Sequence, residues 1–185
     1  MVNAVAPDMH GRASRDRGPF QFPGLLDQLF HYYCAMPALS HMLWFNGQAE
    51  EAVNLYTNLF KNSKIHNVFK QPDGGVLTID FELLGLKYIA LNGGDMFSFT
   101  EAFSVVVRCN DQAEVDKYWD ALTADGGTPG NCGWLKDKFG LSWQIIPKQL
   151  GECLSNPEPV KAQAAMAAMM GMSKLIVSEL EAAVK

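Results

Sequence analysis

A segment near the start of the chain occurs a second time further on, and this repeat constrains the fold more than any other feature. Met42–Phe60, MLWFNGQAEEAVNLYTNLF, and Phe103–Leu122, FSVVVRCNDQAEVDKYWDAL, share an apolar run, a polar turn and an amphipathic stretch. The matching residues are Asn46, Gln48, Ala49 and Glu50 in the first copy and Asn110, Gln112, Ala113 and Glu114 in the second. Two copies of one strand–turn–helix unit predict a pseudo-symmetric domain, and we expect its site where the copies face each other.

Each copy contains apolar residues at helical spacing. The first helix is marked by Ala49, Ala52, Val53, Tyr56 and Phe60, and the second by Val115, Tyr118, Trp119 and Leu122. Residues at i, i+3, i+4 and i+7 lie on one face of a helix, so each helix has one face to bury.

Strand and turn patterns follow both helices. In the first copy, residues 63–70, 76–84 and 86–92 predict three strands separated by glycine turns, which gives the order β-α-β-β-β. In the second, we expect a strand at 103–109, a helix at 111–124 with Asp111 as its N-cap, and strands at 132–137 and 141–147. Residues 162–172 and 174–184 predict one or two closing helices after a proline break. The predicted fold class is α+β.

Composition excludes several classes of function. The chain has 185 residues, of which 48% are hydrophobic, and a formal charge of −5, which gives no basic surface for nucleic acid. Apolar runs stay short of the roughly 20 residues that a membrane span needs. The four cysteines are far apart without a CxxC pair, which predicts reduced thiols in a cytoplasmic protein.

Residues 1–37 differ in composition from the rest. They mix Gly, Pro, Arg and Asp without periodicity, and their order of charged and apolar segments does not match a signal peptide. We interpret them as a disordered leader. An alternative hypothesis places the natural start at Met36, with the upstream residues a misassigned start; the N-terminal mass of native protein distinguishes Met1 from Met36.

Three motifs resemble a known family. LWFNGQAEEAVNLYTNLF, ALNGG at 90–94 and CGWLKDKFGLSWQIIP at 132–147 resemble the PhnB-like branch of the glyoxalase/bleomycin-resistance, or vicinal oxygen chelate, superfamily. Its members are often described as 3-demethylubiquinone-9 3-methyltransferase-like. The resemblance covers residues 38–172, with modules at about 38–94 and 101–147, and leaves 173–185 as a C-terminal helix. It implies two βαβββ modules forming an incomplete barrel around a cavity, in a homodimer.

The methyltransferase description does not fit the glycines of this chain. A nucleotide cofactor needs a glycine-rich turn between a strand and a helix. Here Gly74 and Gly75 lie between two predicted strands, and Gly93 and Gly94 end a strand without a GxGxxG motif. We therefore do not expect methyl transfer.

The resemblance also implies a divalent metal in the active members of the superfamily. Its ligands come from the first and last strands of each module, and these positions fall at His41, Ala90, Phe103 or Ser104, and Gln144. One histidine and one amide do not supply the three or four ligands that a metal site requires. We expect an incomplete ligand set, with His41 as the candidate ligand.

Five residues are the candidates for binding a small apolar or aromatic molecule. Strand alternation places Gln144 with Ser142 and Ile146, and Trp143 on the opposite, core-facing side. Trp44 and Trp134 offer ring surfaces, Asn92 a second amide, and Phe97 a residue that closes over the mouth.

Three functions remain open on this basis. The first hypothesis is a metal-free binding protein with a cavity between its modules. One alternative is a metal-dependent lyase, isomerase or dioxygenase that uses His41 and Gln144, and the other is a structural dimer with a filled cavity.

Overall fold

The computed structural model describes residues 39–185. The predictions made for residues 1–37, including the disordered leader and the start at Met36, lie outside the described residues.

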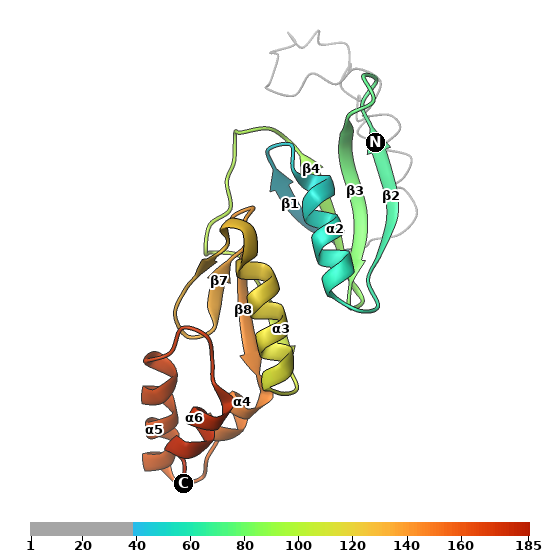
Figure 1. The fold of residues 1–185 in the computed structure, drawn as a ribbon. Helices are drawn as coiled ribbons and strands as arrows, with labels where there is room; N and C mark the ends of the chain where they lie inside the picture. The colour runs from blue at the N-terminus through green and yellow to red at the C-terminus, as the bar shows by residue number, and fades with distance from the viewer. Residues whose placement is uncertain (1–38) are drawn as a thin grey trace, which may run out of the picture. The chain divides into compact units, whose positions relative to one another are not determined.

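The described part of the chain contains two four-stranded sheets with the same topology (Figure 1). The first sheet has the order β1 (His41–Phe45), β4 (Leu86–Asn92), β3 (Val76–Leu83) and β2 (Lys64–Lys70). The second has the order β5 (Ser104–Cys109), β8 (Ser142–Pro147), β7 (Trp134–Lys136) and β6 (Thr128–Pro129). In each sheet the first two strands are parallel and the other neighbours are antiparallel. The predicted α+β fold with two βαβββ modules is confirmed, although the sequence pattern missed the two-residue strand β6.

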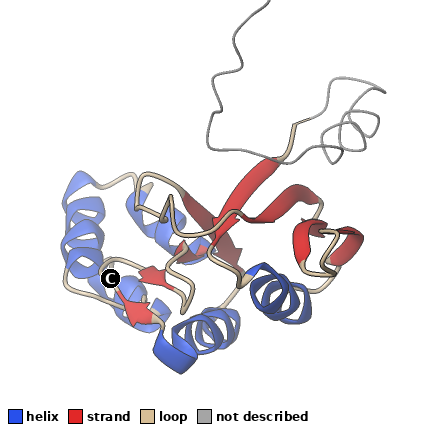
Figure 2. Ribbon diagram, turned by 90° about the horizontal axis from the view of Figure 1, so that it is seen from above, coloured by secondary structure: helices blue, strands red, loops and turns tan. Residues whose placement is uncertain are grey.

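One long helix belongs to each module and begins where the repeat predicts it. Helix α2 covers Ala49–Leu59 and helix α3 covers Gln112–Thr123, followed by the short 3-10 turn Ala124–Gly126. The predicted N-cap is confirmed, since Asp111 accepts a hydrogen bond from the Glu114 backbone N–H at 2.9 Å. Helix α2 packs against β3 and helix α3 against β8, so the buried face of each helix contributes to the core. Figure 2 shows helices and strands of the described residues from above.

The two modules share one hydrophobic core. Trp143 of β8 is fully buried, as the alternation predicted. Its ring stacks on Phe60 with centroids 5.5 Å apart and meets Tyr56 edge-on at 5.1 Å. Because Phe60 and Tyr56 belong to the first module, these contacts hold α2 against the second sheet.

A buried carboxylate joins the same elements. Asp137, only 3% exposed, accepts hydrogen bonds at Oδ2 from the Tyr56 hydroxyl (2.6 Å) and the Trp143 indole N–H (2.8 Å). Its Oδ1 accepts the backbone N–H groups of Phe139 and Leu141 at 2.9 and 3.0 Å, which closes the hairpin between β7 and β8. Burial raises the pKa of Asp137, while these hydrogen bonds oppose the rise. One side chain thus fixes a hairpin and an inter-module contact.

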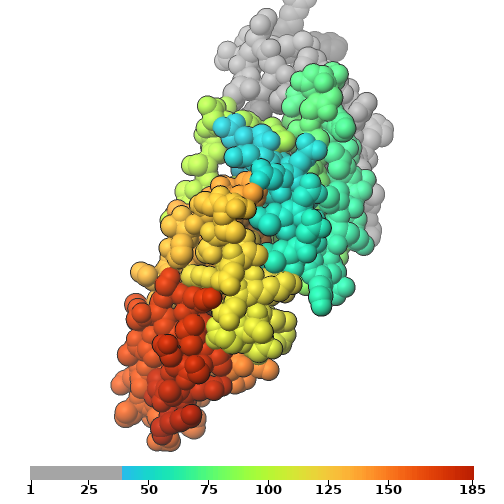
Figure 3. Space-filling view, in the orientation of Figure 1, coloured from blue at the N-terminus to red at the C-terminus, as the bar shows by residue number. Residues whose placement is uncertain are grey.

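Three C-terminal helices form a second, smaller core. They are α4 (Lys148–Leu154), α5 (Pro159–Met170) and α6 (Val177–Ala183), and together they form one contiguous group of atoms next to α3 (Figure 3). The sequence pattern missed α4, whose seven residues include Gly151, and it started α5 three residues late. Pro159 occupies the first turn of α5, where its missing N–H costs no hydrogen bond.

The three cysteines within residues 39–185 differ in accessibility, which predicts their reactivity. Cys109 is buried, and burial, with smaller contributions from Glu114 and Asp111, raises its pKa to about 12. Cys153 is buried as well, whereas Cys132 is partly exposed. Because the thiolate is the reactive form, we expect iodoacetamide to label native Cys132 at least about tenfold faster than Cys109 or Cys153. Site-resolved mass spectrometry measures this; equal labelling of Cys109 and Cys132 would contradict the buried position of Cys109.

Candidate functional site

The second sheet has one face that is turned away from the shared core. Trp143 and Ile145 of β8 are fully buried on the core side, and strand alternation places Ser142, Gln144 and Ile146 on the opposite face. We call this opposite surface of β5, β8, β7 and β6 the open face. Val106 of β5, which is 52% exposed, belongs to it.

The strand register arranges the open face in two rows. One row crosses all four strands and is polar, consisting of Ser104, Ser142, Lys136 and Thr128. The next row consists of Val106, Gln144 and Trp134. The Gln144 amide donates a hydrogen bond to the Ser104 hydroxyl at 2.9 Å, which links the two rows. Polar and aromatic groups therefore lie side by side on a fixed scaffold.

A cavity of about 270 Å³ lies at the β6 and β7 side of this face. Its lining residues are Glu101, Thr128, Pro129, Gly130, Trp134, Leu135, Lys136 and Ser142. The Lys136 ammonium contacts the Glu101 carboxylate at 2.6 Å, and this hydrogen bond lowers the pKa of Glu101. Glu101 comes from the segment that links the modules, so the cavity is lined by the second module and this linker.

Two of the five predicted binding residues lie on the open face. Trp134 lines the cavity, and Gln144 is its direct cross-strand neighbour. Trp44 and Phe97 form a separate pair at the first sheet, with ring centroids 4.9 Å apart. The Trp44 indole N–H donates to the Gly94 carbonyl at 2.9 Å, and a Cβ at Gly93 would lie 2.2 Å from a Trp44 ring atom. The two pairs thus belong to different sheets.

Asn92 has a different environment. It pairs in register with Phe45 on the core side of the first sheet. Its carbonyl oxygen accepts the Ala49 backbone N–H at 2.9 Å, and its NH₂ group donates to the Val76 carbonyl at 3.0 Å. The amide therefore caps the start of α2 and ties it to β3, and it is not part of the site that we propose below.

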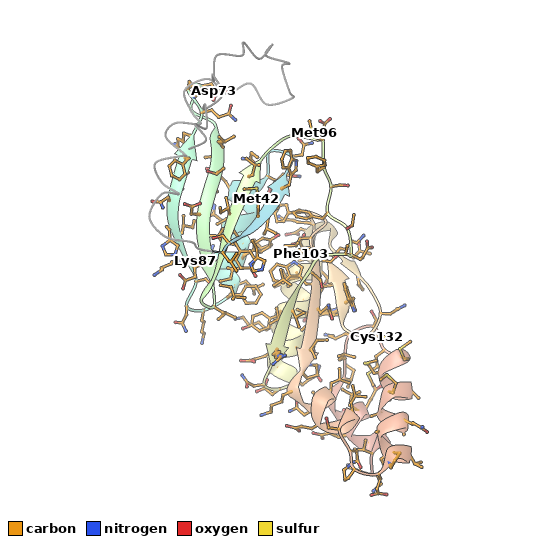
Figure 4. The ribbon with its side chains drawn as sticks, turned by 180° about the vertical axis from the view of Figure 1, so that it is seen from behind. Met42, Asp73, Lys87, Met96, Phe103 and Cys132 are labelled. Carbon is orange, nitrogen blue, oxygen red and sulfur yellow. The ribbon has the colours of Figure 1, made fainter. Side chains whose placement is uncertain are left out.

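His41, the candidate metal ligand, lies among aromatic rings. Its ring centroid is 5.3 Å from that of Tyr88 and 6.0 Å from that of Phe103. Phe103, which directly precedes β5, is labelled in Figure 4. Within residues 39–185, no three His, Cys, Asp or Glu side chains are close enough to hold a metal ion. At the other positions that the resemblance marks, Ser104 and Gln144 hydrogen-bond to each other. The incomplete ligand set therefore stays a prediction, with His41 as its one candidate histidine.

Sequence reasoning did not single out Lys136, Glu101 or Asp137. Ser142 was placed on the face of Gln144 by alternation, but its neighbour Lys136 follows only from the register of β7 against β8. Asp137 directly precedes residues 138–140, which connect the two predicted strands 132–137 and 141–147, and an Asp at the start of a turn is the signal that could have identified it.

Known structures define the class of this fold. Residues 39–185 contain two βαβββ modules of the glyoxalase/bleomycin-resistance type. The PhnB protein of Bacillus cereus is 31% identical, with a TM-score of 0.56, and the match covers 60% of this chain and 99% of that one. A protein of Pseudomonas aeruginosa, 15% identical with a TM-score of 0.51, shares the fold over 60% of this chain and 98% of its own.

The particular family follows from the sequence profile. The profile of the 3-demethylubiquinone-9 3-methyltransferase family matches residues 37–146. The chain therefore belongs to this family, the PhnB-like branch of the superfamily. No curated protein matches the chain. Because the profile ends at residue 146, helices α4, α5 and α6 lie beyond the matched domain.

Proposed function

We propose that this chain is a small-molecule binding protein and that the ligand lies on the open face of the second sheet, against Trp134 and beside Gln144. The observation that carries the proposal is the cavity of about 270 Å³ that Trp134 helps to line. Ligand pockets combine apolar walls with a few fixed polar groups and measure roughly 300–1,000 Å³. This cavity lies just below that range, so it suits a ligand of only a few heavy atoms to about the size of one substituted ring.

The chemistry of the walls supports binding of a partly apolar or aromatic ligand. Trp134 supplies a flat apolar surface whose exposed part is available for stacking. Pro129 adds apolar surface, and Ser142 and Lys136 supply polar groups from regular strands. The sequence placed the site between the modules; the proposal moves it onto the second sheet and the linker.

The other functions have weaker support. For methyl transfer, Gly74 and Gly75 lie between β2 and β3, and Gly93 and Gly94 are not followed by a helix, so neither pair forms a nucleotide-binding turn. A metal-dependent step is less well supported, because no group of three His, Cys, Asp or Glu side chains is found among residues 39–185. The homodimer and the cytoplasmic location stay predictions. Among residues 39–185, no helix has the length and hydropathy to cross a membrane.

Ligand-detected NMR on the full chain tests the proposed site. A mixture of small aromatic compounds is screened for saturation transfer, and the compounds that bind are titrated into wild type and Trp134→Ala. We expect the variant to weaken binding by about tenfold, because it removes the ring on which the ligand stacks, and an aromatic pair contributes on the order of 1 kcal/mol beyond the apolar area that it buries. Leu86→Ala, which removes an exposed apolar side chain from β4 of the first sheet, is the control and should leave the affinity unchanged.

Two results would count against the proposed site. The first is the absence of any binder in the screen, and the second is equal affinity of wild type and Trp134→Ala. Circular dichroism of both variants shows whether they remain folded, so that a loss of binding reports on the contact itself.

A further inference from the structure

The most informative group in the cavity is the hydroxyl of Ser142. This residue is 1% exposed and lines the cavity, yet its Oγ has no hydrogen-bond partner among the described residues. A buried hydroxyl without a partner costs free energy, so such groups are rare in folded proteins. A ligand that hydrogen-bonds to Ser142 removes this cost.

A cation stands next to this hydroxyl. Lys136 is the cross-strand neighbour of Ser142, and both residues line the cavity. Directly opposed residues of antiparallel strands have Cβ atoms about 5 Å apart, close enough for both side chains to reach one ligand group. The ammonium of Lys136 is paired with Glu101, whose own side chain is 64% exposed. Since Glu101 belongs to the linker and not to a strand, it is the partner that can be exchanged.

We infer that the ligand is a small carboxylate with an apolar or aromatic body. Its carboxylate takes the place of Glu101 on Lys136 and accepts a hydrogen bond from Ser142, while its body packs on Trp134. This inference rests on the proposed function, because it assigns the ligand class of the same cavity. A cationic ligand is disfavoured, since the strand residue beside Ser142 is itself positively charged.

The test compares two probes of the same shape. Phenylacetate carries the carboxylate, and phenylacetamide replaces it with a neutral amide. Both are titrated into the full-length protein, with backbone amide NMR shifts of residues 128–144 as the readout. We expect phenylacetate to bind about tenfold more tightly than phenylacetamide, the difference that one charge-assisted hydrogen bond makes.

Three variants test which side chains cause the preference for phenylacetate over phenylacetamide. Lys136→Met keeps the apolar stem and should weaken phenylacetate binding about tenfold without changing phenylacetamide binding. Ser142→Ala should weaken phenylacetate binding several-fold while the protein stays at least as stable, because an unpartnered buried hydroxyl is removed. Glu101→Gln removes the competing carboxylate and should tighten phenylacetate binding.

The outcomes separate this inference from the proposed function. Equal binding of the two probes, with no effect of Lys136→Met, overturns the carboxylate assignment and leaves the cavity as a binding site. If neither probe perturbs residues 128–144 while the aromatic screen finds binders that depend on Trp134, the carboxylate assignment is also wrong. If the screen too finds no binder, the proposed function fails as well.

Discussion

Asp137→Ala should destabilise the protein by about 4 kcal/mol and lower the melting temperature by roughly 10 °C. The substitution leaves four donors without an acceptor: the Tyr56 hydroxyl, the Trp143 indole and two backbone N–H groups. Each buried donor that loses its partner costs on the order of 1–3 kcal/mol, and removal of the buried charge offsets part of that sum. Urea unfolding followed by tryptophan fluorescence measures the difference.

Two milder variants measure how much single hydrogen bonds contribute to the destabilisation by Asp137→Ala. Tyr56→Phe removes one donor and should cost about 1.5 kcal/mol. Asp137→Asn keeps one acceptor oxygen but places an NH₂ group against the Trp143 N–H, so it should cost about 2 kcal/mol. If all three variants unfold at the wild-type urea concentration, the inter-module network does not contribute to stability.

Wild type and Asp137→Asn should also differ in how their stability depends on pH. Burial raises the pKa of Asp137 above its ordinary value despite four hydrogen bonds. An acid whose pKa is raised on folding adds stability that is present below its unfolded pKa and is lost as pH rises through its folded pKa. The stability of wild type relative to Asp137→Asn should therefore be greater at pH 4 than at pH 7.

Gly127→Ala is expected to have the second largest effect, about 3 kcal/mol of destabilisation. A Cβ at this position would lie 2.3 Å from the Leu122 carbonyl oxygen and 2.6 Å from the Thr123 Cα. Both are backbone atoms at the end of α3, so neither can rotate away. Gly127 leads into β6, whose Thr128 and Pro129 line the cavity, and the displacement should therefore also change probe binding.

Gly151→Ala is the matched control for this substitution. Gly151 lies inside α4, and a Cβ there would meet no atom within 4 Å. Alanine in a helix interior is more favourable than glycine by roughly 0.5–1 kcal/mol, so this variant should be slightly more stable than wild type. A thermal melt of both variants tests the pair, and equal melting temperatures would argue against the close approach at Gly127.

The two modules have sheets of the same topology, but different residues stabilise the start of the helix in each module. In the first module, Asn92 accepts the Ala49 N–H at the start of α2. In the second, the N-cap is Asp111, and Gln112 binds the C-terminal segment through the Leu175 carbonyl and the Val177 N–H. The equivalent Gln48 makes no side-chain cap. The helices beyond the family domain thus use one copy of the repeated Gln as an anchor.

The sequence by itself determined the repeated module, its helices and most of its strands. These follow from local periodicity, since residues 3–4 apart share a helix face and alternate residues share a strand face. The pattern therefore placed Trp143 in the core and Gln144 on the other face before any contact was known.

Only the tertiary structure decided which groups meet. Lys136 and Ser142 become neighbours through the register of β7 against β8, and Tyr56 reaches Asp137 across 81 positions of sequence. Asn92 caps α2 because the packing of α2 on the first sheet brings the Ala49 N–H to the Asn92 amide oxygen. Periodicity assigns a side chain to a face, but strand register and the packing of one module on the other assign its partner, and binding depends on the partner.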